Sequence, residues 1–259
     1  MRWSQVLVSQ CTRPDAGRDV TLPLFARWGF DKVEAFATWA GSRLDWHDDP
    51  AALREEAERH GLRYLTYHLP ALDEPGRTED EALRDVLDAI DFAREVGVGK
   101  VYLRSQTFDG YARHGRRLAE TAVAAGMVPL VEPHDHTPTP DTRQTRRVLD
   151  AIGHDAVRAV LELGHLDRAG DPWEQFLDAM GGFESRGGLV VGVHLKNTRD
   201  GGGWERWREG RLDLPAILDR CDADGFDGDL VIETTLGDPA VTEADLLDLR
   251  DYLRDRLDG

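Results

Sequence analysis

Short apolar segments alternate with helical patterns along the whole chain. Each apolar segment has the length of a buried strand and is bounded by polar or turn-forming residues, as in strands that are covered on both faces. The segments between them repeat apolar residues at helical spacing, for example Leu83, Val86 and Ile90. We therefore predict eight strands, at residues 6–8, 33–36, 62–67, 100–103, 128–131, 156–162, 189–194 and 230–233.

Capping residues mark the predicted helices. Thr78 and Glu81 have the spacing of a capping box. Asp49 and Pro50 form an N-cap and first-turn pair, and Gly97 has the residue type that ends a helix in the left-handed conformation. A polar, glycine-rich loop is expected at 197–211, and helices are expected at 22–28, 49–60, 78–97, through 118–126, around 148–152, after 171–172, and at 215–221 and 242–257.

Strands and helices that alternate in this way imply a parallel sheet with right-handed crossovers. A closed (β/α)8 TIM barrel fits best, because such barrels fill about 250 residues and this chain has 259. A doubly wound open sheet is the rival architecture, but no Gly-x-Gly-x-x-Gly follows any predicted strand. Since no linker or change of composition divides the chain, we expect one α/β domain over residues 1–259.

The last four predicted strands all close with a side chain that can bind a metal ion. A charge at the end of a buried strand is costly unless something pairs with it. Barrel enzymes build their active sites at these C-terminal strand ends, so the four groups are expected to converge. Three carboxylates and one imidazole suit Mn²⁺, Mg²⁺ or Co²⁺ better than a structural zinc ion. The alternative for each residue is an ordinary paired side chain, and the four are Glu132, Glu162, His194 and Glu233.

Net charge and cysteine content limit the classes of partner and the cellular location that we expect for this protein. The formal net charge of −17 argues against a nucleic-acid partner, whose phosphates would be repelled. No segment approaches the roughly 18 consecutive apolar residues of a membrane span, and the N-terminus has no signal-peptide pattern. Cys11 and Cys221 are far apart in the sequence and lack Cys-x-x-Cys spacing. We therefore expect a cytoplasmic protein with reduced thiols and without a membrane partner.

Short motifs at the last four strand ends resemble those of the xylose isomerase-like TIM barrels, a family of sugar phosphate isomerases and epimerases. The family pattern is a glutamate after strand five, Asp-x-Gly-His after strand six, His-hydrophobic-Lys-Asp after strand seven and a glutamate after strand eight. The segments 209–213 and 225–228 also resemble the family's run into its last strand. The matching motifs here are Val131-Glu132, Glu162-Leu163-Gly164-His165, His194-Leu195-Lys196-Asn197 and Ile232-Glu233.

The resemblance implies a divalent-metal-dependent isomerase or epimerase that acts on a ketose or a related sugar or polyol. In the related ketose epimerases, the glutamates that match Glu132 and Glu233 bind the metal and move protons on opposite faces of the sugar. A C–H beside a carbonyl is acidic only if the developing enediolate is stabilised, which a divalent ion does. The resemblance thus implies catalytic roles for Glu132 and Glu233. It also implies one bound divalent ion. Mn²⁺ is the ion we expect, Mg²⁺ or Co²⁺ is possible, and Zn²⁺ is less favoured.

Two positions depart from the family pattern. Glu162 stands where the family has a metal-binding aspartate. Its extra methylene moves the carboxylate by more than one ångström, on the order of one C–C bond, unless the backbone lies further back. Asn197 stands where an aspartate follows the lysine. These departures leave the identity and the occupancy of the metal site open.

Other polar and aromatic residues of the predicted barrel mouth are candidates for contact with a substrate. For Lys196, an ion pair at the mouth is an equal alternative, and His134 could instead donate a hydrogen bond to a metal ligand. Trp204 could be a mobile lid that stacks on a sugar, or it could anchor its loop together with Trp207. Glu34 is expected in an ion pair of the barrel wall. The substrate-contact candidates are His165, Lys196, His68, Arg104, His134 and Trp204.

Other functions on the same scaffold remain open. A dehydratase of the inosose or 3-dehydroshikimate type would begin with the same proton abstraction, and a barrel that binds without catalysis would explain the two departures. Cleavage of abasic DNA is disfavoured, because the segment 204–208 lacks the histidine that those relatives place there and the chain is acidic. The sequence also allows a homo-oligomer.

Overall fold

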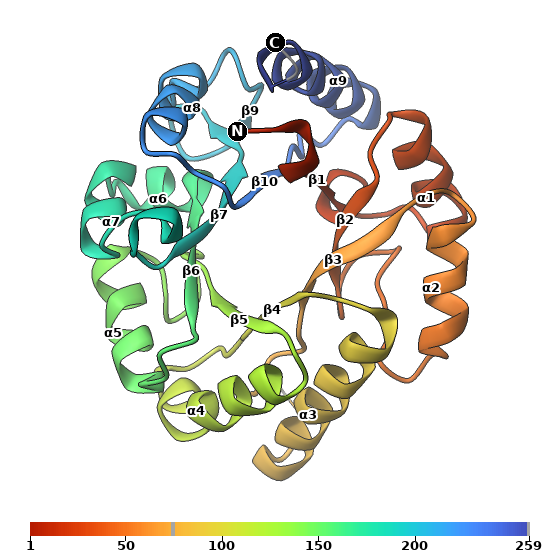
Figure 1. Cartoon of the computed structure of the whole chain (residues 1–259), viewed down its shortest axis with the longest axis vertical. Coiled ribbons are helices and arrows are strands. Elements are labelled where there is room, and N and C mark those ends of the chain that lie inside the picture. Colours follow the sequence, from red (N-terminus) through yellow and green to blue (C-terminus); the bar gives the residue numbers. More distant parts are fainter. Residues whose placement is uncertain (74–75, 258–259) are drawn as a thin grey trace.

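The computed structural model describes residues 1–73 and 76–257. Eight parallel strands close into a barrel, and the helices form a ring around it (Figure 1). This confirms the predicted (β/α)8 TIM barrel. Around the barrel, each strand pairs with its neighbour in sequence, and the last strand closes on the first; the strands are β1 (Val6–Ser9), β2 (Lys32–Phe36), β3 (Arg63–His68), β4 (Lys100–Tyr102), β5 (Val128–Val131), β6 (Arg158–Glu162), β7 (Val190–Leu195) and β10 (Asp229–Ile232).

The predicted caps form as expected. Thr78 and Glu81 make a reciprocal capping box, Asp49 accepts hydrogen bonds from the backbone N–H groups of Ala51 and Ala52, and Gly97 has a left-handed φ of 94°. None of the helices in the described part of the chain has the length and apolarity needed to cross a membrane. The helices are α1 (Arg18–Arg27), α2 (Pro50–Glu58), α3 (Glu79–Val96), α4 (Phe108–Ala124), α5 (Thr142–Ile152), α6 (Leu163–Ala169), α7 (Trp173–Ala179), α8 (Leu214–Ala223) and α9 (Pro239–Leu257), with short 3-10 turns at Trp3–Gln5, Gln10–Thr12 and Glu184–Arg186.

The segment after β6 differs from the prediction of a single helix. Helix α6 begins immediately after the strand, because Glu162 acts as its N-cap and accepts a hydrogen bond from the His165 backbone N–H. The following helix, α7, is not capped by Asp171 as expected. The Asp171 carboxylate instead accepts a hydrogen bond from the Thr142 backbone N–H at 2.6 Å and so ties this loop to α5. Strand, cap and helix thus hold Glu162 in one place.

The predicted loop at 197–211 contains a small antiparallel sheet, formed by β8 (Asn197–Thr198) and β9 (Trp204–Glu205). Asn197, the only asparagine in the sequence, organises this segment. Its amide nitrogen donates to the carbonyl oxygens of Trp207 and Leu212, both at 2.9 Å, and its amide oxygen accepts from the Leu212 N–H at 2.9 Å. Because an aspartate could not donate these bonds, the departure from the family pattern at Asn197 has a structural cause.

Strand geometry directs the polar strand ends into the barrel mouth. Leu130 and Val160 pack with Tyr102 in a cluster separate from the main core. Side chains two residues apart on a strand point the same way, so Glu132 and Glu162, two positions further on, share the direction of Leu130 and Val160. In the β6–β7 pairing the Cα atoms of Glu162 and His194 are register partners. The carboxyl ends of neighbouring strands thus meet at one end of the barrel.

We expect the substitution Asn197→Asp to lower the free energy of unfolding by about 2 kcal/mol, because it removes two donated hydrogen bonds and places a carboxylate against two carbonyl oxygens. Urea unfolding followed by circular dichroism measures this. Gln175→Glu, the same amide-to-acid change on an exposed helix position, should change stability by less than about 0.5 kcal/mol. Equal stability of the two variants would contradict the role given to Asn197.

Candidate functional site

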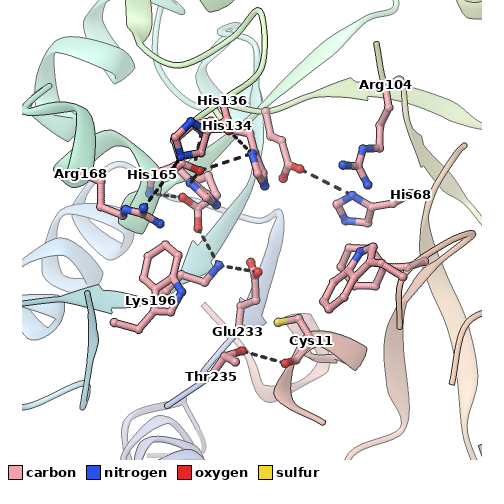
Figure 2. A pocket seen from close by; sticks show the side chains of 16 residues that line it. Cys11, His68, Arg104, His134, His136, His165, Arg168, Lys196, Glu233 and Thr235 are labelled. Carbon is pink, nitrogen blue, oxygen red and sulfur yellow. Dashed lines mark hydrogen bonds and ion pairs between the residues drawn. The ribbon is translucent and has the colours of Figure 1, made fainter. Parts of the chain in front are cut away.

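A cavity of about 360 Å³ lies at the barrel mouth. Figure 2 shows His165, Arg168 and Lys196 on one side of it and His68 and Arg104 on the other. Of the ten site residues predicted from the sequence, His194 is buried beneath the surface of the cavity with 1% of its side chain exposed. The nine that line the cavity are His68, Arg104, Glu132, His134, Glu162, His165, Lys196, Trp204 and Glu233.

The predicted carboxylate ligands lie close to Lys196 and His194. Glu233 Oε1 accepts a hydrogen bond from Lys196 Nζ at 2.6 Å, and Glu233 Oε2 lies 2.9 Å from His194 Nδ1. Glu132 Oε2 lies 3.7 Å from the same His194 nitrogen. Glu162 caps α6 with Oε2, whereas its buried Oε1 has no hydrogen-bond partner in the described part of the chain and lies 3.8 Å from Lys196 Nζ.

His194 is oriented from below by two other barrel residues. Its Nε2 lies 2.8 Å from the Tyr102 hydroxyl and 3.3 Å from Glu34 Oε2. Its buried Nδ1 faces two carboxylates, with Glu233 Oε2 at 2.9 Å and Glu132 Oε2 at 3.7 Å. A carboxylate behind one imidazole nitrogen, with the second nitrogen directed at further possible ligands, is the arrangement that supports histidine as a metal ligand. Glu34, expected as an ion-pair residue of the barrel wall, forms that pair with His194 and has a further role in orienting it.

The donor atoms fit a divalent cation. Three carboxylates and one imidazole meet the preference of such ions for oxygen with some nitrogen, and Glu162 offers a buried oxygen without a hydrogen-bond partner in the described chain. Among the described residues, two groups of three have donor atoms that all lie within 4.8 Å of one another, and neither includes Glu132 or Glu162: Glu34, His194 and Glu233, and His134, Asp135 and His165. We assign Glu34 to the orienting position, because its Oε2 faces Nε2 of His194 and also lies 3.4 Å from His68 Nε2.

Crowding of the carboxylates shifts their proton affinities. Burial raises the pKa of Glu132 to about 8, and the neighbouring carboxylates add to the rise, although His194 opposes it. Burial also raises the pKa of Glu162 to about 7, against the charge of Lys196. For Glu233 burial would raise the pKa, but Lys196 and His194 outweigh burial and lower the pKa well below the ordinary value of a carboxyl group. The site therefore holds carboxyl groups of very different acidity.

A second polar cluster adjoins the first. His134 and His165 stack with ring centroids 4.0 Å apart, and Asp135 Oδ1 lies 2.7 Å from His165 Nδ1. Arg168 pairs with the other Asp135 oxygen at 2.8 Å. His134 Nδ1 lies 2.7 Å from the backbone oxygen of Asp135, so this nitrogen does not donate to a predicted metal ligand. Since Arg168 neutralises Asp135, we regard this cluster as one wall of the cavity.

Trp204 and Trp207 have different environments. Trp204 lies against the cavity, with Lys196 Nζ 4.3 Å and the Arg168 guanidinium 4.7 Å from its ring centroid. Gly164 permits this packing, because a Cβ there would lie 2.8 Å from both Lys196 and Trp204 atoms. Trp207 is buried in the core and donates through its indole N–H to a carboxylate of α9 at 2.8 Å. Trp204 is therefore a packed wall of the cavity, and Trp207 anchors the segment.

His68 is held between aromatic rings. Its ring centroid lies 4.2 Å from that of Phe36 and 3.8 Å from that of Tyr102, and both pairs are stacked. Burial lowers the pKa of His68 to about 4, although Glu34 opposes the shift. His68 is therefore neutral at physiological pH, and neither of its buried ring nitrogens makes a hydrogen bond to a described residue.

Several residues of the site could not be identified from the sequence. Asp135 directly follows His134, and Tyr102 lies in a predicted strand, but only the closed barrel brings them to the site. No sequence motif indicated a role for Trp39 in the site. It is 53% exposed, lines the cavity and has a positive φ of 54°. The other non-glycine residue with positive φ in the described chain, His136, also lines the cavity. Backbone strain of this kind clusters at functional sites.

The chain belongs to the xylose isomerase-like TIM barrel family, whose family model matches residues 22–255. Comparison with curated proteins by sequence finds no significant match. Among solved structures, the chain is similar to the IolI protein with a bound zinc atom, at 15% identity and a TM-score of 0.76, over 98% of each chain.

Two further solved structures have the same fold. A D-tagatose 3-epimerase-like protein is 15% identical over 98% of each chain, with a TM-score of 0.75. The probable 3-DHS dehydratase AsbF from Bacillus anthracis is 15% identical over 96% of this chain and 98% of its own, with a TM-score of 0.72. At this identity the likeness establishes the fold, and it leaves the reaction and the metal ion undetermined.

The strained backbone at Trp39 leads to a prediction that separates backbone from side chain. Trp39→Gly should be more stable than Trp39→Ala by about 1 kcal/mol, because both variants lose the indole but only alanine keeps the cost of a Cβ in the left-handed region. Thermal or urea unfolding of the pair measures the difference. At exposed Val123 in α4 the order should reverse, with alanine more stable than glycine. The same order at both positions would contradict a strained backbone at Trp39.

Proposed function

We propose that this protein is a divalent-metal-dependent isomerase or epimerase of a ketose or a related sugar or polyol. The observation that supports this most directly is the group of three carboxylates and one imidazole around a single cavity, in which the buried Glu162 Oε1 has no hydrogen-bond partner in the described chain and His194 Nδ1 faces Glu233 and Glu132. The family supports a small-molecule sugar substrate. A cavity of about 360 Å³ is large enough for such a molecule.

In this proposal Glu132, Glu162, His194 and Glu233 hold the ion, and Mn²⁺ is the expected one. When bound, a divalent ion stabilises negative charge that develops on the oxygens of a substrate. The protein prepares this position in two ways. Glu34 and Tyr102 direct His194 Nδ1 toward the carboxylates, and the N-cap bond of Glu162 leaves one of its oxygens free.

Glu132 and Glu233 are the proposed acid and base. Their pKa values lie far apart: that of Glu132 is raised to about 8 by burial, whereas Lys196 and His194, against the effect of burial, keep that of Glu233 well below its ordinary value. Glu233, which these cations keep ionised, is the proposed acceptor of a proton from a carbon beside a carbonyl, and Glu132 is the residue proposed to return one. Lys196 and His165 offer polar contacts to substrate oxygens from one wall of the cavity.

Water elimination is a second candidate reaction, favoured by the structural similarity to a probable 3-DHS dehydratase. It starts from the same proton abstraction, and then a hydroxyl group on the neighbouring carbon leaves. Analysis of the products distinguishes the two reactions. Dehydration creates an unsaturated carbonyl compound that absorbs in the ultraviolet, whereas epimerisation creates no such compound. A barrel that binds sugars without catalysis would produce neither product nor solvent-deuterium uptake.

We expect Glu233→Gln to abolish turnover, by about 10³-fold or more, and to leave the protein folded, because the amide cannot accept the proton. NMR of deuterium uptake from solvent into candidate ketoses, with D-tagatose and D-fructose as first probes and Mn²⁺ present, measures the loss. Circular dichroism checks the fold, and Glu174→Gln on the exposed start of α7 is the matched control. Near-normal uptake in Glu233→Gln would refute its assignment as the base.

Metal binding should strengthen with pH. Burial raises the pKa of Glu132 to about 8 and that of Glu162 to about 7, so an ion must displace their protons below these values, which weakens binding by up to about tenfold per pH unit for each proton. We expect Mn²⁺ to raise the unfolding temperature more at pH 8 than at pH 6, measured after removal of metal with EDTA.

The double variant Glu132→Gln, Glu162→Gln is the control for this dependence, because its amides do not titrate between pH 6 and pH 8. It should bind Mn²⁺ more weakly at both pH values, and its dependence on pH should be smaller than that of the wild type. An identical Mn²⁺ effect at pH 6 and pH 8 in the wild type would contradict the proposed ligand set.

A further inference from the structure

Arg104 differs from the other half-buried arginines of the protein. In the described chain these are Arg13, Arg18, Arg104, Arg158, Arg250, Arg254 and Arg256, and all except Arg104 donate a hydrogen bond to a carboxylate or a carbonyl oxygen. The side chain of Arg104 has no hydrogen-bonded or acidic partner within the described residues. In a chain with 49 acidic and 32 basic residues, a guanidinium without a carboxylate needs an explanation.

The position of Arg104 is defined by its backbone. It lies two residues after the end of β4, and its carbonyl oxygen accepts a hydrogen bond from the Leu72 N–H at 3.1 Å. Its side chain lines the main cavity and also an adjoining hollow of about 20 Å³ that Glu132 and His134 share. In Figure 2 the guanidinium lies beside His68, on the side of the cavity opposite Lys196 and Arg168.

The two other cationic side chains of the cavity already form ion pairs with carboxylates of the protein. Arg168 pairs with Asp135 at 2.8 Å, and Lys196 pairs with Glu233 at 2.6 Å and lies 3.8 Å from Glu162. The guanidinium of Arg104 is therefore the unmatched cationic group of the cavity. A guanidinium offers parallel N–H donors that fit the two oxygens of a carboxylate or a phosphate.

We propose that the substrate of this site is an anionic sugar, with a carboxylate or phosphate group that Arg104 binds at the end of the cavity away from Lys196. This inference rests on the proposed function and deepens it, because it names the substrate class. The reactive carbons then lie between Glu132 and Glu233, and the charge of the substrate fixes its orientation. Neutral sugars of the same size lack this contact and bind more weakly.

Binding to Mn²⁺-loaded protein, measured by isothermal titration calorimetry, tests the proposal with matched probes: D-fructose, D-fructuronate and D-fructose 6-phosphate. The wild type should bind at least one of the two anions about tenfold or more tightly than D-fructose, and the better anion identifies the group. Arg104→Gln should lose this preference. Arg104→Lys should retain part of it, because lysine keeps the charge but not the paired donors.

Arg117→Gln is the matched control, since Arg117 is exposed on α4, on the outer ring of the barrel, and should leave the preference unchanged. The unfolding temperature of Arg104→Gln without ligand should equal that of the wild type, because the side chain makes no bond to the described protein. A large loss of stability would mean that Arg104 has a structural role, and it would overturn the proposal.

The outcomes separate this inference from the proposed function. Equal affinity of the wild type for neutral and anionic sugars, or an unchanged preference in Arg104→Gln, overturns the anionic substrate and leaves the isomerase proposal intact. Inorganic phosphate is titrated in parallel. If it binds in an Arg104-dependent way while no sugar binds or takes up deuterium, the anion site stands and the sugar isomerase proposal fails.

Discussion

Mutual repulsion among carboxylates in a nearly closed space is the constraint on which the rest of the barrel mouth depends. Glu132, Glu162 and Glu233 lie at the carboxyl ends of β5, β6 and β10 on the same barrel rim, and burial removes most of the water that would otherwise screen them. The protein compensates with Lys196 and His194, whereas Glu34 below adds to the negative charge. This leaves Glu132 and Glu162 with raised pKa values, of about 8 and about 7, because burial outweighs their cationic neighbours. A divalent cation would supply the charge that the protein itself lacks there.

Glu162 shows how one side chain can serve the fold and the site together. One carboxylate oxygen caps α6, which starts directly after β6, and the other is buried without a hydrogen bond to the described residues. A longer side chain than the aspartate of the family pattern is compatible with both tasks, because the first oxygen is taken up by the helix N-terminus. Asn197 is explained differently, since its amide holds the segment that carries Trp204.

The cavity has two electrostatically different ends. Lys196, Arg168 and Trp204 pack together on one wall, with the charges of the two cations directed at Glu233 and Asp135. On the other wall the aromatic pair of Phe36 and Tyr102 holds His68 neutral, beside the free guanidinium of Arg104. A small molecule in this cavity therefore meets balanced charge at one end and positive charge at the other.

Local patterns in the sequence were sufficient for the barrel and for much of its rim. Apolar strand segments, helical spacing and the caps at Asp49 and Thr78 depend on neighbouring residues, so the order of strands and helices could be read without tertiary information. The closing polar residues of strands five to eight followed from the same pattern, because parallel strands end at one edge. The roles assigned to these residues rest on the family resemblance and on the proposals above.

The tertiary structure alone decided which side chains meet. Glu34 and Tyr102 lie in strands that are distant from His194 in sequence, and only barrel closure brings them to its Nε2. The left-handed backbone at Trp39, the helix that Glu162 caps and the hairpin around Asn197 depend on packing that no local pattern encodes. The lack of a partner for Arg104 in the described chain is likewise a property of all its neighbours at once. Contacts between residues far apart in the chain are set by the closure of the barrel, and for that reason the chemistry of the cavity emerged only with the fold.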